Sequence, residues 1–409
     1  MEKNKTMKKV KNEKVHIAEG KEENLHIRLI FALVLICAFG CLMVFSASSY
    51  ICSQKEMYEY DAMYMLKKQA GAMVLGFGII AASLFMNVSW LAEKLATIIY
   101  LLGYICIFLL KSPFAVSSHG ATRWIRLMGI QFQVAEVVKI SVIIMLAHMV
   151  KKYARHISRP ALTIRMWMAG GIPAILLFLI SSDLSSSVVV LAITFGITFI
   201  TNRTLKLHIA VLLAAVVVVG AYVFSIASNM PTPEELGKVS FRVGRIAAWI
   251  DPERYADDQG FQTLNSLYAM GSSGLLGKGI GNSVMKKGPI PEPQNDMIFA
   301  IIVEELGIFG AGTLIFLYMY ILYLLLRVIL KRNVLYESTI VLGVMIHIGV
   351  QAFFNIGVTL NVLPNTGIGL PFISYGGTSI LCLMAEMALV CSIAKKDYLK
   401  RIKNINKSF

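Results

Sequence analysis

Charged residues are scarce in this chain: Asp, Glu, Lys and Arg together make up 15% of its 409 positions. Hydrophobic residues account for 56%, and the mean hydropathy is +0.67. Apolar runs of about 20 residues recur along most of the length, which is what a helix needs to cross a bilayer. The composition therefore excludes an ordinary soluble protein and predicts a polytopic integral membrane protein.

Cysteine and histidine offer no ligand pattern. Of six cysteines, five fall in predicted spans and Cys52 falls in a predicted outer loop, so neither a disulfide framework nor a metal cluster is expected. The seven histidines show no metal-ligand spacing, and no Ser-His-Asp or Cys-His arrangement is visible. His347 stands as a lone histidine within a span, and Glu386 in the last span is expected to contact either a partner or another helix.

Ten apolar segments predict an all-α fold, because a lipid-exposed backbone must satisfy its own hydrogen bonds. Basic tails, residues 1–26 and 395–409, flank the transmembrane domain, residues 27–394. A large extracytoplasmic loop, residues 229–296, separates the seventh and eighth spans. The predicted spans are 27–48, 67–87, 94–111, 132–150, 165–182, 184–201, 206–228, 297–328, 338–360 and 376–394.

Lysine and arginine gather in the short loops of one side and in both tails, which predicts that this side and both termini are cytoplasmic. The net charge of +15 is explained mainly by these anchors and anionic lipid, so nucleic-acid binding is not inferred. The first apolar run is a full span with no small-residue cleavage site behind it, so we do not interpret it as a cleavable signal peptide.

Asp296 begins the eighth span, and Glu304 and Glu305 follow two turns later. A carboxylate costs roughly 2.5–3.5 kcal/mol at the centre of a membrane helix, so a span that keeps two of them must use them. For Asp296 two roles stay open: capping the free N–H groups of the helix, or chemistry at the membrane surface.

Other polar residues converge on the same outer face. Glu136 and Lys139 share a helical face at i, i+3, either as a structural ion pair or as a substrate contact. Arg123 precedes their span, and Asp183 lies between the fifth and sixth spans.

The long loop carries cations and glycines. Arg242 and Arg245 lie at i, i+3 on a predicted interfacial amphipathic helix. In the glycine-rich run 271–281, Lys278 supplies a cationic point for phosphate, unless the run is only a flexible hinge. No strand precedes the glycines and Gly279 follows Lys278, so neither a dinucleotide fold nor a nucleotide phosphate loop is predicted.

Four blocks in order carry a family resemblance. The segments GATRWIRLMGIQFQVAEVVKI (120–140), SDLSSSVVV (182–190), RVGRIAAWIDP through IPEPQNDMIFAIIVEELGIFGA (242–311) and FNIGVTLNVLPNTGIGLPFISYGGTSIL (354–381) resemble those of the shape, elongation, division and sporulation (SEDS) family, also called FtsW/RodA/SpoVE. The IPEP and GIGNS strings are more similar to its division and sporulation members than to its rod-elongation member. The chain departs from the family pattern in four places, none of which removes a charged group: Val134 and Ala135 replace a Pro-Ser pair, Ser-Asp-Leu-Ser surrounds Asp183, Gln294 replaces His, and Met297 replaces Phe.

The resemblance implies a peptidoglycan glycosyltransferase that polymerises lipid II at the outer leaflet of the bacterial cytoplasmic membrane, with inversion and with Asp296 as general base. It implies substrate binding by Arg123, Glu136, Lys139, Asp183, Arg242, Arg245, Gln262, Lys278, Ser374 and Gly376. A divalent cation, Mg or Mn, is expected near Asp183 or Glu136, and no organic cofactor is expected. The metal ligands themselves are unknown.

The implied partners are lipid II, the undecaprenyl-diphosphate-linked glycan, a class B penicillin-binding protein and other divisome or elongasome membrane proteins. Gly307, Gly310 and Gly312 mark a candidate contact for the penicillin-binding protein, or they serve internal packing. Two other functions stay open: a lipid II flippase, which should bury its ionisable residues at the midplane between inverted repeats, and a scaffold without catalysis, which would not need Asp296.

Overall fold

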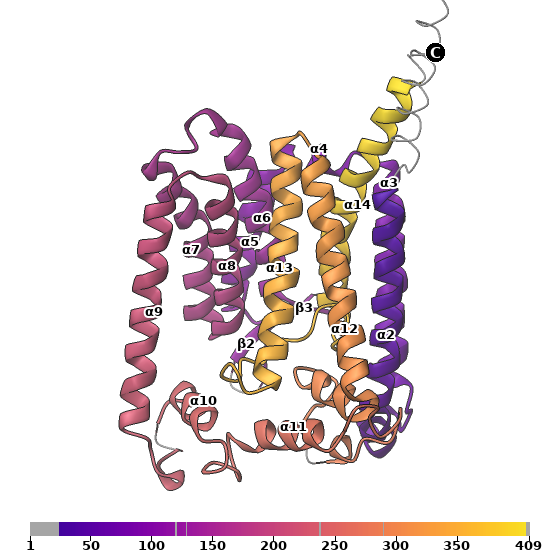
Figure 1. Cartoon of the computed structure of the whole chain (residues 1–409), viewed down its shortest axis with the longest axis vertical. Coiled ribbons are helices and arrows are strands. Elements are labelled where there is room, and N and C mark those ends of the chain that lie inside the picture. The colour runs from indigo at the N-terminus through magenta and orange to yellow at the C-terminus, as the bar shows by residue number, and fades with distance from the viewer. Residues whose placement is uncertain (1–23, 119–120, 128, 237–238, 289, 406–409) are drawn as a thin grey trace, which may run out of the picture.

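The computed structural model describes residues 24–118, 121–127, 129–236, 239–288 and 290–405. Long helices stand roughly parallel, and the connections between them gather at the two ends (Figure 1). The long helices are α2 (Leu25–Gln54), α3 (Tyr64–Phe85), α5 (Ala96–Leu109), α6 (Val134–Lys152), α7 (Pro160–Ser181), α8 (Leu184–Thr201), α9 (Leu205–Ser228), α12 (Ile298–Lys331), α13 (Leu335–Thr359) and α14 (Gly377–Ile405).

Within the described residues, eight helices are long and apolar enough to cross a membrane, or nine if α4 (Val88–Lys94) and α5 form one span bent by 71°. The predicted third span, 94–111, corresponds to α5, and the bend between α4 and α5 lies at its start. The fourth predicted span, 132–150, corresponds to α6, which is not among these helices: it has the length but carries Glu136 and Lys139. Because α6 is enclosed by α5, α7, α8 and α13, protein surrounds these two charges.

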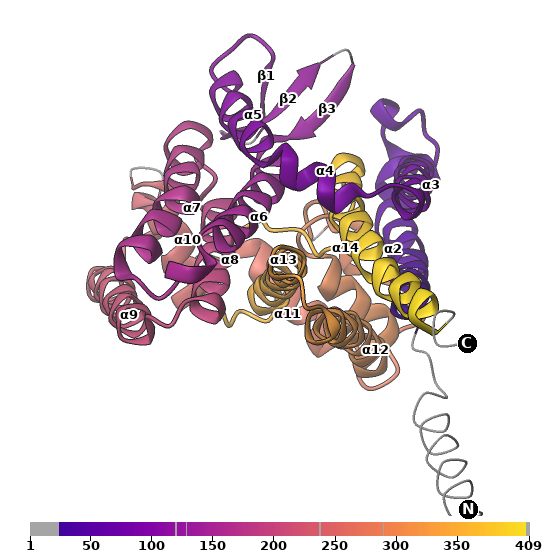
Figure 2. The ribbon, with the colours of Figure 1, turned by 90° about the horizontal axis from the view of Figure 1, so that it is seen from above.

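The helical prediction is confirmed apart from a small antiparallel sheet. Strands β1 (Ala115–Ser118), β2 (Ala121–Leu127) and β3 (Ile130–Gln133) pair in that order, with Ile125 opposite Phe132. The sheet lies beside α5, outside the main bundle (Figure 2). Gln133 ends β3 and directly precedes α6, so the sheet fixes where α6 begins and hence where Glu136 lies.

α13 is the central helix, packed against α6, α8, α12 and α14. By contrast, α9 stands at the edge of the bundle, and among its side chains only His208 and Ile226 are buried (Figures 1 and 2). The segment between α9 and α12 carries α10 (Phe241–Ile250) and α11 (Phe261–Gly271), which lie across one end of the bundle. Short 3-10 turns complete the chain at Glu56–Tyr58, Ala154–His156, Pro233–Glu235 and Met285–Lys287.

α12 is broken at Gly307, whose φ of 64° and ψ of −162° are not helical. The glycine-rich loop fills the break: the Lys278 and Gly279 amides donate to the carbonyls of Glu304 and Glu305, both at 2.9 Å. A Cβ on Gly307 would lie 2.2 Å from the Leu275 carbonyl oxygen, so only glycine fits. The glycine-rich run 271–281, predicted as either a ligand-binding loop or a flexible hinge, is thus bonded to the backbone of α12.

Cys52 corrects one prediction. It was expected in an outer loop, but α2 extends to Gln54, and Cys52 is fully buried on its last turn. All six cysteines are free.

Candidate functional site

Asp296 lies immediately before α12 but does not cap it. The N-cap residue is Met297, and no side-chain capping hydrogen bond is present there. The Asp296 side chain is partly buried, and its Oδ1 accepts a hydrogen bond of 3.3 Å from Nε2 of Gln262 on α11. The alternative that this carboxylate serves the helix terminus therefore has no support in the geometry.

Burial raises the pKa of Asp296 above its ordinary value of 3.8, because a charged carboxylate loses hydration there. The positive charge of Arg245 and the hydrogen bond from Gln262 act in the opposite direction and favour the charged form. A carboxylate with a raised pKa is a better proton acceptor than an exposed one, which is the property that a general base needs.

The loop between α13 and α14, residues 360–376, closes around Asp296. Nδ2 of Asn355 on α13 donates both to the Asp296 carbonyl at 2.7 Å and to the Ile368 carbonyl at 2.8 Å. Oγ of Ser374 donates to the Asn295 carbonyl at 2.6 Å. The predicted residues Ser374 and Gly376 thus lie at the site and stabilise its backbone. The Gly376 amide donates to Oε1 of the buried Gln69 at 3.2 Å.

Two elements of the long loop complete this arrangement. Oε1 of Gln262 accepts from Nδ2 of Asn365 at 3.1 Å, and Nη1 of Arg245 donates to the Asn365 carbonyl at 3.2 Å. Asn365 therefore joins α10 to α11 beside the carboxylate of Asp296. Sequence reasoning missed Asn365 and Gln69, since a lone amide in a loop or span carries no motif.

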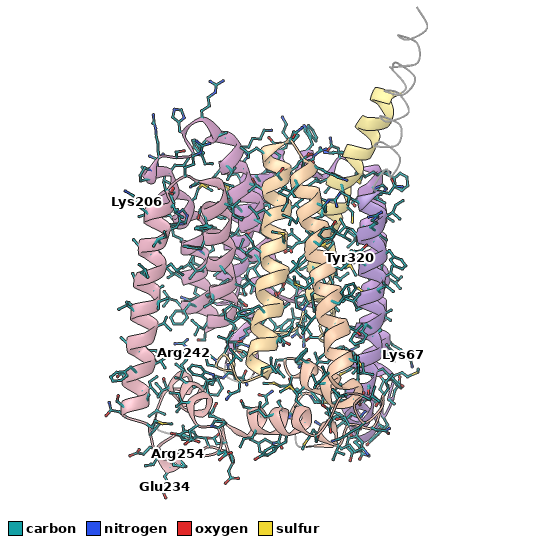
Figure 3. All side chains as sticks on the ribbon, viewed as in Figure 1. Lys67, Lys206, Glu234, Arg242, Arg254 and Tyr320 are labelled. Carbon is teal, nitrogen blue, oxygen red and sulfur yellow. The ribbon has the colours of Figure 1, made fainter. Side chains whose placement is uncertain are left out.

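The two predicted arginines of α10 differ in exposure. Arg242 is exposed, with its guanidinium 4.3 Å from the centre of the Phe178 ring. Arg245 is partly buried over the Phe241 ring at 4.4 Å, and burial lowers its pKa. Arg242 lies at the same end of the bundle as Lys67 and Arg254, whereas Lys206 lies at the opposite end (Figure 3). The Arg242 cation can meet an anion from solvent, while Arg245 acts mainly on Asp296.

Asp183 serves as the N-cap of α8, since its Oδ1 accepts from the Ser186 amide at 3.1 Å and its Oδ2 from the Ser186 hydroxyl at 2.7 Å. Nε of Arg123 on β2 lies 3.9 Å from the same Oδ2. Three buried polar atoms near the site have no hydrogen-bond partner among the described residues: Nε of Arg123, Oε1 of Gln294 and Oδ1 of Asn355.

Glu136 and Lys139 form a buried ion pair of 2.7 Å at the start of α6. Nζ of Lys139 also donates to Oε1 of Gln351 at 3.0 Å. The same chain of contacts continues to α14, where Nδ1 of His347 lies 2.8 Å from Oε2 of Glu386, so Glu386 contacts another helix of this protein.

Lys278 is engaged away from the carboxylate of Asp296, in an ion pair of 2.7 Å with Glu304. Glu305 pairs with Lys286 at the same distance, and both glutamates are fully buried. Glu304 and Glu305 thus hold the glycine-rich loop onto the break in α12. The part of Lys278 in phosphate binding stays a prediction.

Comparison with known proteins identifies the family. Residues 27–399 match the model of FtsW/RodA/SpoVE, described as a cell cycle protein. The chain belongs to this family, and it is a multi-pass membrane protein. The resemblance drawn from the four sequence blocks is confirmed.

Several relatives align along nearly the whole chain. The probable peptidoglycan glycosyltransferase FtsW of Neisseria gonorrhoeae is 31% identical over 92% of this chain and 85% of its own. The FtsW of Bacillus subtilis is 30% identical over 90% and 89%, and stage V sporulation protein E of the same organism is 29% identical over 92% and 98%.

Solved structures share the fold. A chain from a peptidoglycan synthase complex, studied for how it coordinates polymerization and crosslinking, has a TM-score of 0.69 at 23% identity and covers 90% of this chain and 97% of its own. The rod shape determining protein RodA of Thermus thermophilus has a TM-score of 0.62 at 23% identity, over 90% and 96%.

Proposed function

We propose that this protein is a peptidoglycan glycosyltransferase that polymerises lipid II into glycan strands. The family membership and the names of the relatives support the reaction class. The observation that carries the assignment of the base is that the carboxylate of Asp296 is partly buried, held by Gln262 and not used as a helix cap.

In this mechanism the 4-hydroxyl of the GlcNAc on incoming lipid II attacks the anomeric carbon of the growing strand. As the new C–O bond forms, Asp296 accepts the hydroxyl proton. The bond from the anomeric carbon to the undecaprenyl diphosphate breaks on the opposite face, and its electron pair leaves with the diphosphate, so the configuration inverts. Arg242 offers an exposed cation to the leaving diphosphate. Arg245 and Gln262 keep Asp296 charged and oriented.

A divalent cation, Mg or Mn, would supply further charge neutralisation to the diphosphate. The described residues contain no group of three or more His, Cys, Asp or Glu side chains that could hold a metal ion. Mg²⁺ is commonly held by one or two carboxylates together with substrate phosphates, and Asp183 fits that role. Its carboxylate is anchored by Ser186 and lies 3.9 Å from Arg123.

We further propose that the long loop faces the outside of the cytoplasmic membrane, and that both termini are cytoplasmic. The basic residues that end α6 and α12 support this orientation, since Lys151, Lys152 and Lys331 lie at the end away from α10 and α11. Residues 1–23 of the predicted basic tail, 1–26, lie outside the described residues. The proposed partner is a class B penicillin-binding protein that crosslinks the strands within a divisome or elongasome assembly.

Purified protein incubated with purified lipid II, with and without that partner, tests the reaction. We expect glycan strands of many disaccharides, resolved by gel electrophoresis. Transfer of lipid II across proteoliposome membranes without strands would favour the flippase. If glycan strands form only when other enzymes are added to the mixture, the scaffold without catalysis is favoured.

The pH dependence of the reaction should report Asp296. A general base works only when deprotonated, so activity is lost as pH falls through the pKa of Asp296, and burial moves this loss to higher pH than for an exposed aspartate. Replacing Gln262 with Leu removes a hydrogen bond that favours the carboxylate, so the acidic limb of kcat/KM should move to higher pH still. The control is Asn265→Leu on the same helix, because that amide donates only to the Phe261 carbonyl. An unmoved limb in Gln262→Leu would show that Asp296 is not the titrating group.

Two glycines of α12, Gly310 and Gly312, allow separate predictions about contact with the partner. A Cβ on Gly310 would lie 2.1 Å from Cβ of Leu306, whereas Gly312 faces open space. Gly310→Leu should therefore lower thermal stability and the polymerisation rate equally with and without the partner. Gly312→Leu should weaken co-purification of the partner and leave the basal rate unchanged. Undiminished co-purification of Gly312→Leu would remove this face of α12 from the interface.

A further inference from the structure

One face of α13 carries a row of buried polar side chains at a four-residue spacing, and His347, Gln351 and Asn355 are three of them. Residues four apart on a helix lie one above the other. Each of the three bonds to an element other than α13: His347 to α14, Gln351 to α6 and to the 360–376 loop, and Asn355 to Asp296 and the same loop. Lipid-facing helices rarely carry such a row, and here protein surrounds it.

The hydrogen bonds of Gln351 fix the direction of its amide. Oε1 accepts from Nζ of Lys139 at 3.0 Å, and Nε2 donates to the Gly369 carbonyl at 3.0 Å. Turning the amide over would set its NH₂ group against the ammonium and its oxygen against the carbonyl oxygen. Both contacts would then be repulsive, so only one orientation satisfies the surroundings.

This orientation decides the proton positions on His347. Its Nε2 lies 2.9 Å from the same Oε1 of Gln351, which is an acceptor, so Nε2 must carry a hydrogen. Nδ1 faces the Glu386 carboxyl at 2.8 Å, and that contact also needs one hydrogen, on either Nδ1 or the carboxyl. Both arrangements leave the His347–Glu386 pair with no net charge. Together with Glu136 and Lys139, the whole buried chain is then neutral.

The C-terminal part of this row lies next to Asp296, the proposed base. Gln351 holds Gly369 while Asn355 holds its neighbour Ile368 and the backbone of Asp296. Gly367, two residues before Gly369, lies beside the carboxylate, since a Cβ there would be 3.8 Å from Oδ2 of Asp296. A shift of Gln351 would therefore move both the Lys139 ammonium and the loop segment that faces Asp296.

We infer that Gln351 is a positioning residue, which fixes where Lys139 and the 367–369 loop lie relative to Asp296. The His347–Glu386 pair, which shares one proton, holds the amide of Gln351 in place. The inference rests on the proposed function, because it assigns Gln351 a part in that reaction. Gln351 acts through Lys139 and the loop and has no direct part in the chemistry.

Nitrogen NMR of the full-length protein, labelled with ¹⁵N-histidine in lipid nanodiscs, tests the proton positions without any reaction. The His347 signals are those lost in His347→Gln, and His148→Gln on α6 is the matched control that removes another histidine, a partly buried one. We expect Nε2 of His347 to carry hydrogen. An unprotonated Nε2 would overturn the proposed arrangement, whether or not the protein polymerises lipid II.

Kinetics of Gln351→Leu test the positioning role. We expect kcat per folded molecule to fall about tenfold while KM for lipid II changes little, since misplacement of reacting groups affects the transition state more than binding. The control is Asn202→Leu. It removes the buried amide at the C-terminal end of α8, which donates to Thr163 on α7. It should lower the melting temperature without changing kcat. If Gln351→Leu behaves like Asn202→Leu, or keeps full kcat, Gln351 has only a structural role. An inactive wild-type protein would instead refute the proposed function and leave the NMR result standing.

Discussion

Asp296→Asn is expected to lower the rate of glycan polymerisation by about 10²–10⁴-fold, the usual effect of losing a general base. The amide retains the size of the side chain but cannot accept the hydroxyl proton. Its NH₂ group can turn toward solvent while its oxygen still accepts from Gln262, so the protein should remain folded. Single-turnover polymerisation of lipid II by equal amounts of folded protein measures the effect.

Asp257→Asn is the matched control, because this exposed aspartate lies in the same long loop. It should keep the wild-type rate, which would exclude a general effect of loop charge. A near wild-type rate for Asp296→Asn would show that the carboxylate is not the base. The proposed mechanism would then fail, although the family membership would not.

The sequence was sufficient to predict the helical membrane fold and most of the residues around Asp296. Long apolar runs have few alternatives in a bilayer, so their helices follow from composition. The small sheet escaped prediction because its strands are only four to seven residues long and are specified by pairing with one another. Short pairings of this kind depend on tertiary contacts, which local sequence does not reveal.

The break in α12 was missed for a related reason. Gly307 looks like any small residue in an apolar span until the Leu275 carbonyl is found 2.2 Å from where its Cβ would be. Glu304 and Glu305 gave a real signal, but their partners Lys278 and Lys286 lie 26 and 19 residues earlier, across a loop whose course is set by the same contacts. Buried charge indicated that a partner exists, and only the fold showed which one.

The polar row on α13 was visible in principle. His347, Gln351 and Asn355 repeat every four residues, which places them on one helical face. What the sequence could not supply was the direction of that face, since α6, α14 and the 360–376 loop are far away along the chain. In the structure these three residues connect Glu386, Lys139 and Asp296.

The second large effect is expected at the ion pair of α6. Glu136 and Lys139 are 5% and 2% exposed. In Glu136→Ala the buried ammonium therefore keeps, among the described residues, the neutral Oε1 of Gln351 as its hydrogen-bond partner. Breaking a buried pair in this way typically costs about 3–5 kcal/mol. Thermal unfolding in detergent should show a large loss of stability, and polymerisation should fall by about 10²-fold as Lys139 moves.

The double variant Glu136→Ala, Lys139→Met separates stability from function. Methionine removes the stranded charge and fills the same apolar space, so the stability lost in Glu136→Ala should return in large part. Polymerisation should stay low, because the cation that Gln351 holds near the substrate side of the bundle is gone. Full activity of the double variant would reduce the pair to a packing element. Equal instability of the single and double variants would instead mean that the loss came from the space left by Glu136, and that the buried charge of Lys139 was not its cause.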